Sequence, residues 1–231
     1  MRMPFSVLLP AIFAAAVVAT PPVHAAERTF PVTAFDRIIV LASSDVDVRT
    51  GVAPSVAASG APADLERLDI KVEGGALVIG TRKGASRRMS RKPVTIRVTT
   101  QTLAAAVVSG SGDMTIDRVE GPFSGMISGS GDMDVGALQF PGVALAITGS
   151  GTMRAAGLCG SGAISITGSG NIDASGLRCR TAKACISGSG NVTLSATDTA
   201  DLRVTGSGNV TLTGGARYTT TTTGSGTIRC G

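Results

Sequence analysis

The chain has 231 residues and a formal net charge of +5, with 43% hydrophobic residues, 3% aromatic residues and no tryptophan. One histidine and four cysteines leave little material for an imidazole-dependent catalytic triad or a zinc centre. Because few aromatic side chains are available to stack bases, we expect no specific binding of nucleic acid.

The N-terminal residues have the pattern of a secretory signal peptide. Arg2 supplies a positive charge, residues 7–19 form an apolar segment, and Val23-His24-Ala25 offers a cleavage site. We therefore interpret residues 1–26 as a cleaved signal peptide. The mature protein is then exported, to the periplasm or the outer surface, and has lost its only histidine. No later stretch is long and apolar enough for a transmembrane helix.

Residues 30–108 alternate between apolar and polar residues, which is typical of short strands with one buried face. Strands are predicted at residues 37–40, 46–48, 68–72, 77–79 and 94–98. Gly74-Gly75 indicates a tight hairpin, whereas Pro54, Gly60 and Pro62 indicate loops. No linker separates this region from the remainder, so we interpret it as the irregular N-terminal coils, or cap, of a single domain at residues 27–231.

A basic run lies between two of these strands. It consists of Arg82, Lys83, Arg87, Arg88, Arg91 and Lys92. Such a loop can attract acidic glycans, lipopolysaccharide or other anionic envelope polymers through screened electrostatics. The alternative is a solvated loop that binds nothing.

Within residues 109–231, seven Gly-Ser-Gly motifs form a series at intervals of 18–20 residues. Their first glycines are Gly110, Gly129, Gly149, Gly168, Gly188, Gly206 and Gly224. Apolar residues alternate on both sides of each copy, so each unit is predicted to form two short strands that meet at a turn, where glycine supplies positive φ angles. Stacked units share a continuous core that one unit cannot form. The sequence therefore predicts an all-β, single-stranded β-helix or solenoid with 18–20 residues per coil.

A polar residue follows each repeat, and the first two of these residues are Asp113 and Asp132. Paired carboxylates can act as acid and base or hold a cation. The column continues mainly as Asn and Thr, however, which favours capping of the turn. Both aspartates stay candidate binding residues, and we expect no catalytic residue, no metal site and no cofactor.

The cysteines are Cys159, Cys179, Cys185 and Cys230, and they allow three pairings if all are bridged. Cys159 and Cys179 occupy nearly equal positions in successive repeats, so we predict a disulfide between them. Cys185 falls in an outward position and Cys230 in an inward column, which argues against a bridge between those two.

The last repeat replaces the aliphatic inward residues with Thr220 and Thr222, within the run Thr219–Thr223. Polar β-branched residues at the end of a solenoid can blunt the open edge. The same edge could instead serve self-association.

The order of these features resembles a known family. Phe35–Ile38 and Ser44–Val48 precede a Gly-Gly-x-Leu-x-Ile hairpin at residues 74–79, and residues 94–98 lead into Ser-Gly-Ser-Gly-Asp at 109–113. Over residues 30–229 this resembles the bacterial "putative auto-transporter adhesin, head GIN domain" family. The resemblance implies an exported right-handed β-helix, similar in shape to pectin-lyase-like proteins but without a recognised catalytic constellation, and a role in adhesion.

Together these patterns favour an exported, non-enzymatic cell-envelope or surface protein that adheres to glycans or other polymers along its long faces. One alternative is a structural envelope subunit that forms a homo-oligomer through its Thr-rich end. The other is a polysaccharide-active enzyme that uses Asp113 and Asp132.

Overall fold

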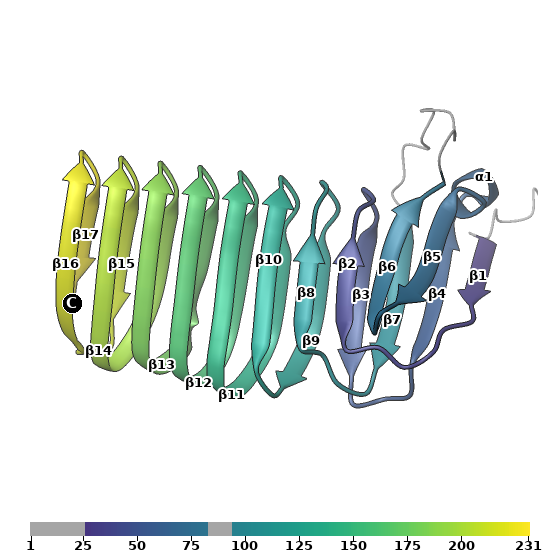
Figure 1. Cartoon of the computed structure of the whole chain (residues 1–231), viewed down its shortest axis with the longest axis horizontal. Helices are drawn as coiled ribbons and strands as arrows, with labels where there is room; N and C mark the ends of the chain where they lie inside the picture. Colours follow the sequence, from purple (N-terminus) through teal and green to yellow (C-terminus); the bar gives the residue numbers. More distant parts are fainter. Residues whose placement is uncertain (1–25, 83–93) are drawn as a thin grey trace, which may run out of the picture.

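The computed structural model describes residues 26–82 and 94–231, which form one elongated stack of strands (Figure 1). The N-terminal elements are β1 (Ala26–Phe30), β2 (Arg37–Val40), β3 (Asp45–Thr50), β4 (Ser55–Gly60), α1 (Pro62–Leu65), β5 (Leu68–Glu73), β6 (Ala76–Thr81) and β7 (Thr95–Thr100). The repeat elements are β8 (Ala105–Val108), β9 (Met114–Glu120), β10 (Phe123–Gly129), β11 (Met133–Gly149), β12 (Thr152–Gly168), β13 (Asn171–Gly188), β14 (Asn191–Gly206), β15 (Asn209–Thr213), β16 (Arg217–Gly224) and β17 (Thr227–Cys230). The predicted all-β solenoid is confirmed.

The strands lie on two faces that meet at the Gly-Ser-Gly turns, which form the upper edge in Figure 1 and are called the turn edge below. The front face consists of β5, β6, β2, β8, β10, the second halves of β11–β14 and β16, in that order. The back face consists of β1, β4, β7, β3, β9, the first halves of β11–β14, β15 and β17. The hydrophobic core lies between these two faces.

Each repeat strand pairs in parallel with its counterpart one coil along the rod. Ile147 pairs with Ile127 on one side and with Ile166 on the other, and all three are at most 1% exposed. Because equivalent residues stack on one another, the alternation in a single repeat becomes a buried column along the whole rod. The inward columns predicted from the sequence are buried as far as β14 and β15.

The two glycines of the repeat have different structural roles. Gly149, a first glycine, has a φ of 136°, which side-chain-bearing residues rarely adopt. Gly151, a second glycine, has no positive φ, but a Cβ there would collide with the carbonyl oxygen of Gly131 in the preceding coil. The sequence predicted the first role only.

The order of the N-terminal coils along the rod differs from their order in the sequence. β2 pairs with both β6 and β8, and β3 pairs with both β7 and β9. The first coil of the chain is therefore inserted between a later coil and the repeats, which buries Ile38 completely. Alternation shows which residues face inward but does not identify the neighbouring coil, so this order was not predicted. At Pro62, where a loop was expected, the chain forms the single helical turn α1.

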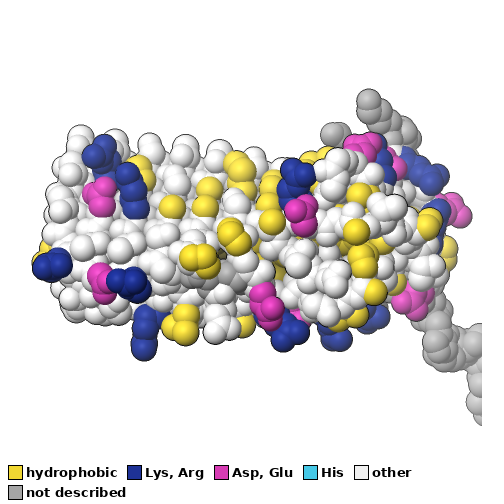
Figure 2. Space-filling model, turned by 60° about the horizontal axis from the view of Figure 1, so that its bottom comes forward, with side chains coloured by type: hydrophobic (Ala, Val, Ile, Leu, Met, Phe, Trp, Pro, Cys, Tyr) yellow, Lys and Arg dark blue, Asp and Glu magenta, His cyan; other side chains and the backbone are white. Residues whose placement is uncertain are grey.

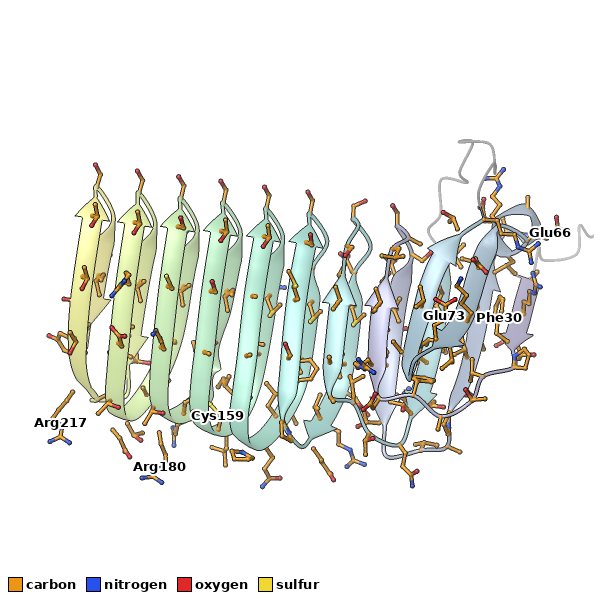
Figure 3. The ribbon with its side chains drawn as sticks, viewed as in Figure 1. Phe30, Glu66, Glu73, Cys159, Arg180 and Arg217 are labelled. Atoms are coloured by element: carbon orange, nitrogen blue, oxygen red, sulfur yellow. A yellow bond between two sulfur atoms is a disulfide. The ribbon has the colours of Figure 1, made fainter. Side chains whose placement is uncertain are left out.

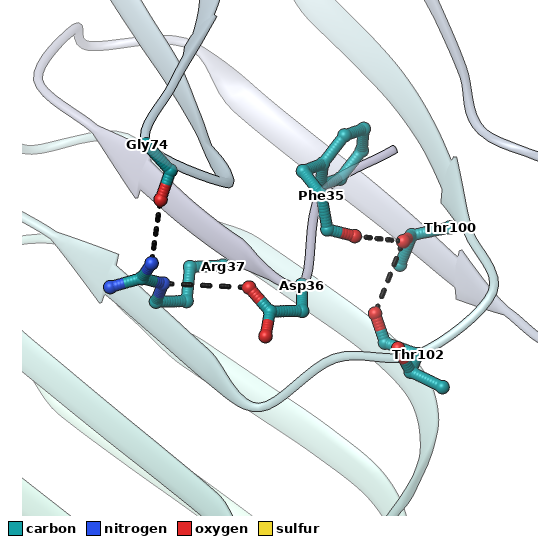
Figure 4. A network of polar contacts seen from close by, with 6 residues as sticks. All are labelled: Phe35, Asp36, Arg37, Gly74, Thr100 and Thr102. Atoms are coloured by element: carbon teal, nitrogen blue, oxygen red, sulfur yellow. Dashed lines mark hydrogen bonds and ion pairs between the residues drawn. The ribbon is translucent and has the colours of Figure 1, made fainter. Parts of the chain in front are cut away.

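Polar contacts connect the inserted coil, which contains β2 and β3, to its neighbouring segments (Figure 4). Thr100 is fully buried, and its hydroxyl donates to the carbonyl oxygen of Phe35 at 2.7 Å. The guanidinium of Arg37 donates to the carbonyl oxygen of Gly74 at 2.6 Å and lies 3.4 Å from the carboxylate of Asp36. The predicted Gly74-Gly75 hairpin, which joins β5 and β6, thus contacts the start of β2 directly.

Candidate binding groove

One row of outward residues on the back face crosses strand after strand of the rod. In spatial order the row reads Arg97, Asp47, Thr115, Asp134, Arg154 and Asp173. Each residue pairs in register with the next, so their side chains leave the sheet on the same side at the spacing of neighbouring strands, about 4.8 Å. The row continues beyond Asp173 with Thr193, Thr211 and Arg229.

Two hollows lie along this row and adjoin at Thr115, which lines both. The first holds about 710 Å³ over β4, β7, β3 and β9, and its polar lining residues are Asp47, Arg49, Ser55, Arg97, Thr99, Thr115 and Asp117. The second holds about 310 Å³ over β9, β11, β12 and β13, and its polar lining residues are Thr115, Asp134, Arg154, Asp173 and Ser175. We call the two hollows together the binding groove.

The groove carries charges of both signs. Arg154 lies 3.4 Å from the carboxylate of Asp134, and about half of each side chain is exposed. The pKa of Asp173 lies below its usual value, because the Ser175 hydroxyl and backbone N–H hydrogen-bond its carboxylate and outweigh the effect of burial, with a smaller contribution from Arg154. Exposed ion pairs of this kind contribute little to stability, so these groups are free to exchange their contacts for those of a ligand.

This lining suits a ligand rich in hydroxyl groups. Guanidinium groups donate hydrogen bonds, carboxylates accept them, and the hydroxyls of Thr99, Thr115 and Ser175 do both. A sugar hydroxyl needs donors and acceptors close together, and each hollow offers both kinds. These residues were not predicted from the sequence, because each looks like an ordinary outward residue of a separate strand.

The structure places Asp113 and Asp132 on the turn edge, away from the residues that line the groove. The carboxylate of Asp113 accepts the backbone N–H of Asp132 at 3.0 Å, and that of Asp132 accepts the N–H of Thr152 at 2.8 Å. Each bond therefore joins one coil to the next instead of closing the turn that carries the side chain. Asn171, Asn191 and Asn209 extend the column through hydrogen bonds of 2.8 and 2.9 Å between their side chains.

Of the basic run, Arg82 lies among the described residues. It is exposed, and its backbone N–H donates to the carbonyl oxygen of Arg67 at 2.8 Å. Lys83, Arg87, Arg88, Arg91 and Lys92 lie outside the described residues. Figure 2, which turns the bottom of Figure 1 toward the viewer, shows further charged side chains in separate groups along the rod, with hydrophobic side chains between them. Arg180 and Arg217 project from the lower edge of the rod (Figure 3).

The predicted disulfide between Cys159 and Cys179 is confirmed. The two residues pair in register on β12 and β13, and both are buried (Figure 3). Cys185 and Cys230 are free and half-buried. Burial raises the pKa of the Cys230 thiol.

Among the described residues, no helix combines the length and the apolar character needed to cross a membrane. No match is found among curated proteins. The sequence family described as "Putative auto-transporter adhesin, head GIN domain" matches residues 34–216. The chain belongs to this family.

Solved structures share the fold of this head GIN domain. A putative adhesin from Bacteroides fragilis NCTC 9343 aligns with a TM-score of 0.83 at 22% identity, over 91% of this chain and 98% of that one. A putative lipid binding protein from Parabacteroides distasonis ATCC 8503 aligns with a TM-score of 0.73 at 22% identity over the same shares. A putative adhesin from Parabacteroides merdae ATCC 43184 aligns with a TM-score of 0.72 at 17% identity, over 91% and 97%. At these identities the likeness concerns the fold alone.

Proposed function

We propose that this head GIN domain is an exported, non-enzymatic cell-envelope or surface protein that adheres to a glycan or comparable envelope polymer, which it holds in the binding groove. The observation that carries the proposal is the in-register row of six polar residues, from Arg97 to Asp173, along two adjoining hollows. The family relationship supports adhesion as the role. The signal-like N-terminal sequence supports export.

The dimensions of the row favour a polymer over a small metabolite. Six strands at the usual spacing give a row about 24 Å long. An extended sugar chain laid along the rod meets a new donor or acceptor at each strand, whereas a single small molecule would occupy one hollow only. The mixed charge of Asp134, Arg154 and Asp173 favours a neutral or mixed-charge glycan at this site. Binding of acidic glycans or lipopolysaccharide by the basic run at residues 82–92 stays a separate prediction.

The non-enzymatic part of the proposal rests on the turn edge. The carboxylates of Asp113 and Asp132 each accept a backbone hydrogen bond from the next coil. Both carboxylates therefore hold successive coils together, and neither lines the binding groove. A polysaccharide-active enzyme would need two carboxyl groups directed at the glycosidic bond of a bound substrate.

The test is a glycan and lipopolysaccharide array with the mature protein, followed by affinity measurements on the strongest ligand for Arg154→Ala and Arg203→Ala. Arg203 is the matched control, because it is an exposed outward arginine on the front face of β14. We expect Arg154→Ala to weaken binding about tenfold, the effect of one charged hydrogen bond, and Arg203→Ala to leave it unchanged.

Two results would contradict the groove assignment. Equal effects of the two substitutions would remove the back face as the binding site. Loss of all binding on deletion of residues 83–92 alone would place the ligand on the basic run instead.

A further inference from the structure

The two ends of the rod differ in how their edge strands are protected. At the N-terminal end, the edge strand β5 carries Asp69, Lys71 and Glu73, with an ion pair of 2.8 Å between Lys71 and Glu73. The other edge strand, β1, carries Glu27 and Arg28 and has α1 beside it. Charged residues and covering elements are devices that keep edge strands from pairing with another chain.

The C-terminal end is less protected within the described chain, because its two edge strands carry one charged residue each, Arg217 and Arg229, and no helix lies beside them. β16 pairs with β14 alone, and β17 pairs with β15 alone. Every residue of β16 is exposed, and residues 218–224 of this strand carry no charge. A long, uncharged, exposed edge of β-forming threonines is suited to pairing with another strand.

The core at this end is also uncovered. In the preceding coil, Val210 and Leu212 are at most 2% exposed. Their counterparts in the last coil, Ile228 and Cys230, are only half-buried. Across from them, Thr220 and Thr222 are exposed where Leu202 and Val204 are buried in the coil before. A further layer on this end would bury all four side chains.

We propose that this end is a dimerisation surface and that its occupant is a second copy of the chain, related by a twofold axis. β16 pairs antiparallel with β16 of the other copy, and β17 pairs with β17, so both faces continue from one rod into the next. The axis passes through the layer that holds Thr220 and Cys230. This inference is independent of the proposed function.

A second copy fits better than a single strand of another protein. β16 and β17 lie on opposite faces, so an occupant must offer two edge strands at the same separation, with apolar residues between them. The same end of another copy does this by symmetry. A single foreign strand would pair with one face and leave Ile228 and Cys230 uncovered.

The charges are compatible with this pairing. When β16 is centred on Thr220, Arg217 lies opposite Thr223 of the second copy, so the two copies of Arg217 are kept apart. When β17 is centred on Cys230, Arg229 lies opposite Gly231, so the two copies of Arg229 do not face each other directly. The charged, covered N-terminal end does not offer a matching surface. The assembly therefore closes as a dimer and does not grow into a fibre.

The first test is the mass of the mature protein by size exclusion with light scattering across the micromolar range. We expect a dimer that Thr220→Lys converts to a monomer with an unchanged circular dichroism spectrum. The matched control is Thr167→Lys, at an exposed outward position on β12. A monomer at every concentration, a dimer that survives Thr220→Lys, or a continuing series of larger species would each overturn the proposal.

Crosslinking through Cys230 gives a second test, which detects the dimer in a chain that keeps Thr220. In a Cys185→Ser variant, a mild copper oxidant should take two electrons and two protons from two Cys230 thiols and join the chains by a disulfide. We expect a dimer band on a non-reducing gel that Thr220→Lys abolishes. Oxidation that leaves the chain monomeric would contradict the twofold arrangement.

Discussion

At the scale of single residues, the fold requires the glycines of the Gly-Ser-Gly repeat but does not require the serine side chain. Gly149 combines a positive φ with a close approach to the carbonyl oxygen of Gly129. Ser150 is exposed, and only its backbone N–H takes part in a contact, donating to the same carbonyl at 2.9 Å. The glycines are thus fixed by the stacking of coils, whereas the serine side chain is not.

Gly149→Ala should therefore lower the free energy of unfolding by about 2–4 kcal/mol, since it adds both backbone strain and a steric clash. Ser150→Ala is the neighbouring control and should change it by less than about 0.5 kcal/mol. Urea denaturation of both variants, followed by circular dichroism, measures the difference. Equal stability of the two variants would mean that the turn can rearrange around an added Cβ.

The repeat allowed the buried columns to be predicted residue by residue, because inward residues such as Ile127 and Ile147 recur at one position in every coil. The partners of Asp113 and Asp132 could not be predicted in the same way. An aspartate after a glycine turn fits a cap on its own turn, and only the stacking geometry shows that its bond reaches the next coil.

At the scale of elements, the disulfide joins two adjacent coils at the lower edge of the rod. Cys159 on β12 and Cys179 on β13 are 20 residues apart in sequence but directly opposite in register. The bond closes a loop of about one coil, which restricts the unfolded chain while leaving the parallel pairing of the two strands intact.

Replacement of both Cys159 and Cys179 by Ala should lower the free energy of unfolding by about 3 kcal/mol, the value expected for a closed loop of this length. Cys185→Ser, at a free cysteine on the front face of β13, is the control and should have little effect. Thermal and urea unfolding under oxidising conditions measures both. If the double variant kept the stability of the parent, the bridge would have no stabilising role.

The positions of the strands in the sequence were largely predictable, whereas the strands with which each one pairs were not. The predicted segments at residues 37–40 and 68–72 correspond to β2 and β5. Alternation and the Gly74-Gly75 hairpin were sufficient to locate them. The insertion of β2 and β3 between later coils depends on pairings between strands far apart in sequence, which no local pattern records.

At the scale of the whole molecule, this insertion shapes the binding groove. The first hollow has its walls on β4, β7, β3 and β9, and the sequence order of these strands differs from their order along the rod. Of the candidate residues found from sequence, Arg82, Asp113 and Asp132 are described and lie outside the groove. Charge runs and repeats are visible in the sequence, whereas a groove across strands is not. The groove and the open C-terminal end are separate surfaces, so polymer binding and dimerisation can be tested apart.

The most direct test of the proposed function is to block the groove at Thr115, the exposed residue that lines both hollows. Thr115→Trp fills the groove without changing its charge, and Thr193→Trp places the same side chain farther along the row, outside the hollows. Affinity for the array-selected glycan should fall at least about tenfold in Thr115→Trp and stay at the parent value in Thr193→Trp. Undiminished binding by a folded Thr115→Trp variant would contradict the groove as the site of adhesion.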